Sequence, residues 1–332
     1  MATETFFTQQ AANRRLSWLL MLSVVALLAA LGLAMGFGLT ADPVASVAIT
    51  GGAVALGTLL ALGSYYRGDE LVLAASRARE VTREEQPRLW NVVEELAIAA
   101  GIPVPRVHLI DDTAPNAFAT GRDPEHASIA ITTGLLEKLD RDGLAGVIGH
   151  ELSHVRNFDI RFALLVGVLV GSIALLADMF LRYAFWFGGG RGGRRGGGGG
   201  LQALAGVLAI LLALMAPIVA RLVQLAVSRQ REYLADATAV ELTRNPAGLE
   251  RALAIIAGDR EVLEVANRAT NHLYIVNPVK KVEERSRGLF STHPPIVDRI
   301  NRLRALRGAS PLSSSESSAL RALEPDGGRG GP

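Results

Sequence analysis

The chain has 332 residues, enough for one or two domains, and its 34 basic and 32 acidic residues leave a formal net charge of +2. This balanced charge, without basic stripes interleaved with aromatic side chains, gives no support for nucleic-acid binding. The absence of cysteine excludes disulfides and thiolate ligands, so any bound metal must be held by histidine and carboxylate groups.

Hydrophobic residues make up 49% of the chain, and four apolar stretches reach the length of about 20 residues that predicts passage through a bilayer. They cover residues 16–39, 44–66, 162–181 and 201–220. Arginines flank the first pair and none lies in its connecting turn, so the positive-inside rule predicts a hairpin with a cytoplasmic N-terminus. The second pair is joined by an Arg- and Gly-rich segment, 182–200, whose charge resists export. Spanning and re-entrant arrangements of that pair therefore both stay open.

The spacing of apolar residues predicts helices and strands between and after these stretches. Runs rich in β-branched residues predict strands at 106–110 and 128–132. Apolar residues three to four apart, with proline or capping residues at several N-terminal ends, predict helices at 87–100, 134–139, 142–157, 224–242, 246–257 and 295–306. The tail, 309–332, is Ser-rich and then Gly-rich, which predicts disorder.

The helix predicted at 142–157 contains an HExxH motif, from His150 to His154. Positions i and i+4 of a helix lie on one face, so the two imidazoles can point at one metal ion. Glu151 projects from the next position, within reach of a water molecule on that metal. This is the arrangement of a zinc metalloprotease. The alternative is a pair of exposed histidines on a solvated helix face.

A catalytic zinc ion usually has three protein ligands, and Glu232 is the candidate for the third. Glu232 and Asp236 are four residues apart in a predicted helix and share a face. Glu232 could bind the metal while Asp236 accepts a hydrogen bond from a ligating histidine, since such histidines nearly always have a partner of this kind. The alternative is that both acids are solvated and offset by Arg229 and Arg231.

The combination of these motifs resembles the HtpX-type bacterial membrane metalloproteases, relatives of the CAAX prenyl endoproteases. The string HELSHVRNFD is followed, after two apolar stretches, by REYLAD and then by STHP. The resemblance covers most of the chain but not the Arg- and Gly-rich segment or the tail. It implies a gluzincin with one Zn²⁺ ion on His150, His154 and Glu232, and with Glu151 as general base.

The resemblance also implies two further site features. His293, in the His-Pro motif, would stabilise the oxyanion; the residues alone also allow a helix-entry role before two prolines. Asn116, Ala117, Phe118 and Ala119 would form an edge strand that pairs with an extended substrate. The alternative there is an ordinary loop with an Asx turn at Asn116.

Taken together, these patterns predict a mainly α membrane protein with a small β-sheet, in which four apolar helices accompany an HExxH gluzincin-type metalloprotease domain. The predicted segments are a transmembrane hairpin, the first protease part, a second apolar pair, the second protease part and a disordered tail, at 1–66, 67–160, 161–223, 224–308 and 309–332. The predicted function is a zinc-dependent endopeptidase of the bacterial inner membrane, with its active site facing the cytoplasm. The resemblance to the HtpX-type proteases further implies that it cleaves misfolded or damaged membrane proteins in envelope stress control, with polypeptides and the lipid bilayer as partners. The alternative is a membrane chaperone or adaptor that keeps the fold without cleaving.

Overall fold

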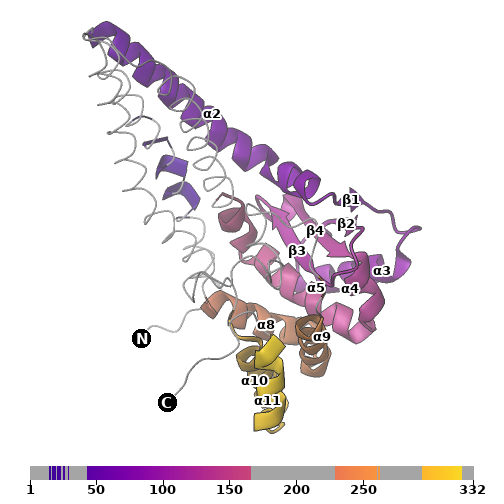
Figure 1. Ribbon diagram of the computed structural model, residues 1–332. Coiled ribbons are helices and arrows are strands. Elements are labelled where there is room, and N and C mark those ends of the chain that lie inside the picture. The colour runs from indigo at the N-terminus through magenta and orange to yellow at the C-terminus, as the bar shows by residue number, and fades with distance from the viewer. Residues whose placement is uncertain are drawn as a thin grey trace, which may run out of the picture. The chain divides into compact units, whose positions relative to one another are not determined.

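The computed structural model describes residues 43–165, 229–259, 261 and 294–323, together with scattered positions between 15 and 29. The chain divides into two compact units, one of residues 1–13, 69–164 and 226–332 and the other of residues 14–68 and 165–225. In the second unit the structure describes chiefly the part of helix α2 (Pro43–Ala75) that precedes Asp69. All the elements discussed below as parts of the site belong to the first unit (Figure 1).

A four-stranded mixed sheet in the order β1-β2-β4-β3 forms the centre of the first unit (Figure 1). β2 and β4 are parallel, and β1 and β3 pair antiparallel with them at the two edges. The strands are β1 (Arg79–Glu80), β2 (Arg106–Ile110), β3 (Ala117–Gly121) and β4 (Ala127–Thr132). The predictions for β2 and β4 are confirmed to within one residue, because their Val, Ile and Leu side chains fit a buried pleated surface.

One face of the sheet packs against helices α3 (Pro87–Ala100) and α5 (Arg141–Arg156) and forms the main core. The side chains involved alternate along each strand, as the period of two residues requires. The strand residues in this core are Val107, Leu109, Ala117, Ala119, Ala127, Ile129 and Ile131. The opposite face packs on the end of α2, where Leu73 contacts a second cluster with Ile110 and Phe118.

Helix α5 lies between the sheet and two later helices, α8 (Arg229–Thr243) and α9 (Pro246–Gly258) (Figure 1). Glycines on α5 allow this close approach. A Cβ atom on Gly146 would lie 2.7 Å from the backbone of Leu249 in α9, and one on Gly149 would lie 3.2 Å from the Cα atom of Ala239 in α8. The side chain of a larger residue would force these helices apart.

The remaining helices differ from the prediction mainly in the tail. The described elements also include α4 (Thr133–Lys138), a 3₁₀ turn (Pro124–His126), α10 (Ile296–Leu306) and α11 (Ser314–Leu323). Helix α11 lies in the segment that was predicted to be disordered. Its N-terminus is a capping box, because Ser313 N donates to Glu316 Oε2 at 2.8 Å and Glu316 N donates to Ser313 Oγ at 3.2 Å. Leu312 and Leu320 pack against the α8–α10 core, which explains the order of this segment.

The membrane part of the predicted fold class is wrong. The residues that the structure describes are mostly helical, with one small mixed sheet. Among these residues, no helix is both long and apolar enough to cross a membrane. The stretch 44–66 lies within α2, where five glycines and the charged residues Arg67, Asp69 and Glu70 interrupt the apolar sequence. The other three predicted stretches lie largely or wholly outside the described residues.

Candidate metal centre

Helix α5 presents the two histidines of the HExxH motif side by side. The helix begins after Asp140, whose side chain accepts a hydrogen bond from Gly143 N and so satisfies one of the free N–H groups at this end. His150 and His154 lie one turn apart, and their Nε2 atoms are 3.3 Å apart. The His150 side chain is almost completely buried, with 1% exposed, and that of His154 is 16% exposed. Any ligand that they bind would therefore be largely shielded from water.

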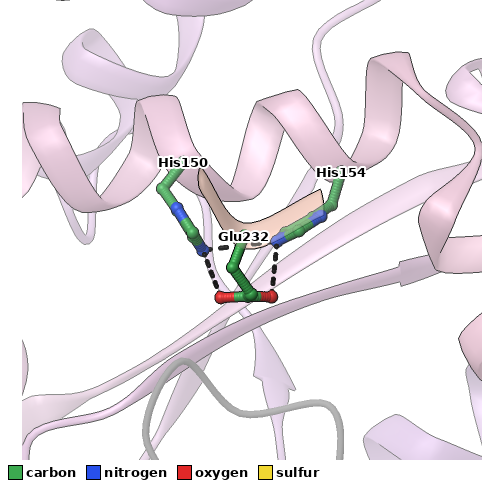
Figure 2. Close-up of side chains that lie close together, drawn as sticks. All are labelled: His150, His154 and Glu232. Atoms are coloured by element: carbon green, nitrogen blue, oxygen red, sulfur yellow. Dashed lines mark hydrogen bonds and ion pairs between the residues drawn. The ribbon is translucent and has the colours of Figure 1, made fainter. Parts of the chain in front are cut away.

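Glu232 reaches the same point from helix α8, which packs across α5. Its Oε2 atom lies 3.6 Å from His150 Nε2, and its Oε1 atom lies 3.6 Å from His154 Nε2. Figure 2 shows the carboxylate facing both imidazoles, with one oxygen toward each ring. One ligand atom from each of the three residues lies within 4.8 Å of the other two. The three residues form a compact and mostly buried group that could hold a metal ion.

The spacing of these atoms fits a tetrahedral metal. Zinc–nitrogen and zinc–oxygen bonds of about 2.1 Å place two ligand atoms of a tetrahedral site about 3.4 Å apart. The 3.3 Å between the two Nε2 atoms matches that edge length, and each Nε2 atom lies 3.6 Å from a different oxygen of Glu232, which is close to it. Two imidazoles and a carboxylate are also a ligand set of catalytic zinc sites, which keep one position open for water or substrate.

The outward-facing nitrogen of His150 is held by Asp236, one helical turn beyond Glu232. Asp236 Oδ1 lies 3.0 Å from His150 Nδ1, so Nε2 is left to face the metal position. Arg299, from α10, donates from Nε to Asp236 Oδ2 at 2.9 Å and from Nη2 to Asp236 Oδ1 at 2.6 Å. Burial would raise the pKa of Asp236, but the charge and hydrogen bonds of Arg299, together with His150, lower it to about 2. Asp236 is therefore ionised at neutral pH and oriented from both sides.

His154 is held in the same manner by Asp159. The distance from His154 Nδ1 to Asp159 Oδ2 is 2.9 Å. This contact depends on a break in the helix, because α5 ends at Arg156 and Phe158 adopts a left-handed conformation with φ of 60°. Arg231 lies on the far side of Asp159, with Nη1 3.6 Å from Oδ1.

The charges around His154 favour a cation at this position. Burial alone would lower the pKa of His154, but the hydrogen bond that it donates to Asp159 and the negative charges of Glu232, Asp159 and Glu151 outweigh this effect and raise the pKa to about 9. In the metal-free protein the imidazole therefore carries a proton at neutral pH. A metal ion would take the place of that proton, since metal-binding histidines bind in the neutral form.

The other predicted site residues have different outcomes. Glu151 is buried, with 3% exposed, and its charge acts on His154. Asn116 comes immediately before β3, and Ala117, Phe118 and Ala119 begin it. Thr132 N donates to Asn116 O at 3.0 Å, which fixes the start of β3 on β4. His293 lies outside the described residues.

Arg299 is the site residue that the sequence analysis missed. It lies on the apolar face of α10, among the buried residues Ile296, Ile300 and Leu303, and is itself fully buried, with 0% exposed. A charged residue in the apolar stripe of an amphipathic helix predicts a buried ion pair, since such a charge is costly to bury alone. That signal was present in the sequence, but it does not identify the partner, Asp236, 63 positions earlier.

Comparison with known proteins gives a consistent result. The model of the family "Peptidase family M48" matches residues 83–307. A protein named "Protease HtpX homolog" from Streptococcus uberis is 42% identical over 299 residues, which cover 90% of this chain and 99% of that protein. Another protein of that name, from Listeria monocytogenes, is 43% identical over 303 residues, which cover 90% of this chain and 98% of that protein. The crystal structure of S. mikatae Ste24p aligns with a TM-score of 0.44 and 16% identity, over 90% of this chain and 67% of that one.

Proposed function

The chain belongs to peptidase family M48, and from that premise we propose that it is a zinc-dependent endopeptidase whose metal is held by His150, His154 and Glu232. Its activity as a metallopeptidase follows from the family, while the metal and the residues that bind it are our assignment. The observation that carries the assignment is the convergence of the three side chains: the two Nε2 atoms lie 3.3 Å apart, and each lies 3.6 Å from one of the two oxygens of Glu232. This spacing suits bonds of about 2.1 Å to a tetrahedral zinc ion.

Hydrolysis then requires one proton acceptor beside the metal, and we assign that role to Glu151. Zinc, when bound, polarises the scissile carbonyl and lowers the pKa of a water ligand to about 7. Glu151 takes the proton of the attacking water and delivers it to the leaving amide nitrogen. Asp236 and Asp159 keep the imidazoles in the orientation that leaves Nε2 toward the metal. The oxyanion donor that we propose is His293.

The edge strand β3 is our candidate for substrate binding. Thr132 N donates to Asn116 O, and carbonyls alternate in direction along an antiparallel strand, so those of Ala117 and Ala119 point away from β4. A substrate strand paired there would be bound through its main chain, with little dependence on its sequence. Ala117 and Ala119 are buried, with 0% and 5% exposed, so this edge must be uncovered before a substrate can pair with it.

Main-chain recognition suits unfolded polypeptides, because only an extended chain can add to a sheet edge. We therefore propose misfolded or damaged proteins as the substrates and protein quality control under envelope stress as the biological role. We also propose that the protein acts at the bacterial inner membrane with its site facing the cytoplasm, on the basis of its apolar composition and its arginine distribution. Cell fractionation tests the location, and recovery of the protein in the soluble fraction would contradict it.

Cleavage of casein, an unfolded model substrate, tests the catalytic assignment. The purified full-length chain would be assayed with added zinc, with a chelator and as Glu151→Gln, with Glu137→Gln on α4 as the matched control. We expect cleavage by the wild type and the control, and none in the chelated sample or in Glu151→Gln. Equal cleavage in all four samples would show that the activity depends on neither a metal nor Glu151, and would contradict the assignment. Binding of casein without cleavage by any sample would favour a chaperone.

A further inference from the structure

We propose that Arg299 is a positioning residue that holds His150 in its metal-binding orientation through Asp236. This inference rests on the proposed function, because it concerns the same metal centre. It links α10, near the C-terminal end of the described chain, to the HExxH helix. If it is correct, the metal centre depends on a segment that contributes none of the three proposed ligands.

Arg299 is connected to His150 through Asp236 and also by a direct contact. The guanidinium donates a hydrogen bond to each oxygen of Asp236, from Nε to Oδ2 at 2.9 Å and from Nη2 to Oδ1 at 2.6 Å. Asp236 Oδ1 in turn lies 3.0 Å from His150 Nδ1, and Arg299 Nη2 itself lies 3.3 Å from the same nitrogen. The fork of two parallel N–H groups fixes the plane of the carboxylate as well as its position. Asp236 therefore cannot rotate away from the imidazole while Arg299 is in place.

Arg299 also acts on the carboxylate proposed as the third ligand. Its Nη1 atom lies 3.8 Å from Glu232 Oε2 and is buried without a hydrogen-bond partner in the part of the chain that the structure describes. The guanidinium charge thus faces two carboxylates on α8, one from Asp236 and one from Glu232, which are four residues apart. Arg299 therefore helps to fix the positions of these two carboxylates relative to the histidines of α5.

The burial of this charge argues for a role other than stability. Arg299 interrupts an otherwise apolar helix face made of Ile296, Ile300 and Leu303, all buried. Replacing a buried ion pair by apolar residues of similar size is often neutral or stabilising, because desolvation offsets the attraction of the charges. If position 299 served packing alone, an apolar residue would therefore be sufficient. Only the orientation of Asp236 and His150 requires the fork of an arginine.

The test is the zinc affinity of Arg299→Lys, measured by competition with a chromophoric chelator on the full-length chain. Lysine keeps the charge but lacks the fork, so it cannot fix both oxygens of Asp236. Loss of such a supporting contact typically weakens metal binding about 10- to 100-fold, and we expect a loss of at least about 10-fold. Arg307→Lys is the matched control on the same segment, since Arg307 pairs with Glu250 at 2.7 Å and touches no ligand. We expect its affinity to stay within about twofold of the wild type.

A second readout separates positioning from a general loss of structure. The visible absorption spectrum of the cobalt-substituted protein reports ligand geometry, and we expect it to change in Arg299→Lys but not in Arg307→Lys. If Arg299 acts chiefly through Asp236, its substitution will weaken zinc binding less in an Asp236→Asn background than in the wild type. Additive losses, or wild-type affinity and spectrum in Arg299→Lys, would overturn the proposal.

Folding and the proposed function are controlled separately. If Arg299→Lys does not fold, the double variant Arg299→Gln/Asp236→Asn replaces it, since that pair removes both buried charges together and leaves neither unpaired. We expect the double variant to fold and to bind zinc at least about 10-fold more weakly than the wild type; wild-type affinity would overturn the inference. A wild-type chain that binds no zinc would refute the proposed function itself.

Discussion

His154 Nδ1 lies 2.9 Å from Asp159 Oδ2, although the two residues are five positions apart. In a continuous helix a residue five positions further on lies about 140° around the axis, on a different face. The turn at Asn157 and Phe158, where Phe158 has φ of 60°, brings Asp159 back beside the imidazole. The end of α5 is therefore part of the architecture of the metal centre.

Asp159→Asn is expected to weaken zinc binding about 10- to 100-fold, the usual effect of losing a carboxylate that orients a ligating histidine. Asparagine keeps the size of the side chain but removes the charge that stabilises the His154 N–H group. Chelator competition measures the change. Asp142→Asn is the control, because Asp142 lies on the same helix, has a half-exposed side chain and pairs with Arg251. Unchanged affinity in Asp159→Asn would show that the contact does not support the metal.

Gly146→Ala is expected to destabilise the protein by about 1–3 kcal/mol, the usual cost of overpacking a core. Its Cβ atom would lie 2.7 Å from the backbone of Leu249, which cannot move without shifting α9. Urea unfolding of the metal-free protein measures the effect. Gly258→Ala provides the comparison, since a Cβ atom there meets nothing within 4 Å. Equal stability of the two variants would mean that α5 and α9 are not held this closely.

Stability is expected to fall as the pH drops below about 6.5, in part through His108. Burial lowers the pKa of His108 from its ordinary value of 6.5, and the nearby charge of Arg106 adds to this, while Glu80 and Asp69 oppose it. The unfolded chain therefore takes up this proton at a higher pH than the folded chain. Folding loses up to about 1.4 kcal/mol per pH unit over the interval between the two pKa values.

His108→Gln should remove that part of the acid sensitivity, as measured by urea unfolding at pH 7.5 and pH 5.5. The matched variant is His126→Gln, because the His126 side chain is 48% exposed and pairs with Asp123 at the surface. We expect the stability difference between the two pH values to shrink only in His108→Gln. The same difference in both variants would place the acid sensitivity elsewhere in the chain.

Much of the protease fold could be predicted from local sequence patterns. Helix α3 matches its predicted bounds, because apolar residues at helical spacing are buried and Gly101, with φ of 67°, ends the helix. The three proposed metal ligands lie close together in space, with one ligand atom of each within 4.8 Å of the other two, and their role as ligands stays a prediction. The HExxH spacing fixes two of them on one helix face, and the ExxxD spacing supplies a carboxylate and its supporting acid.

The parts that the sequence did not reveal depend on contacts between distant segments. Nothing near Arg299 in the sequence indicates that it forms hydrogen bonds with Asp236, 63 positions away. Helix α11 differs for another reason: its Ser-rich composition favours disorder, whereas Ser313 and Glu316 have the spacing of a capping box. In α2 the apolar composition predicts a membrane span, but the helix also contains several glycines and has charged residues near its C-terminal end.

The zinc content of the purified chain tests the central assignment most directly. Wild type and Glu232→Gln would be measured by mass spectrometry after removal of loosely bound metal, with Glu241→Gln, an exposed acid on the same helix, as the control. We predict one zinc ion per chain in the wild type and in Glu241→Gln, and much less in Glu232→Gln, because an amide oxygen is a weaker zinc ligand than a carboxylate. Full zinc content in Glu232→Gln, or none in the wild type, would contradict a zinc centre on His150, His154 and Glu232.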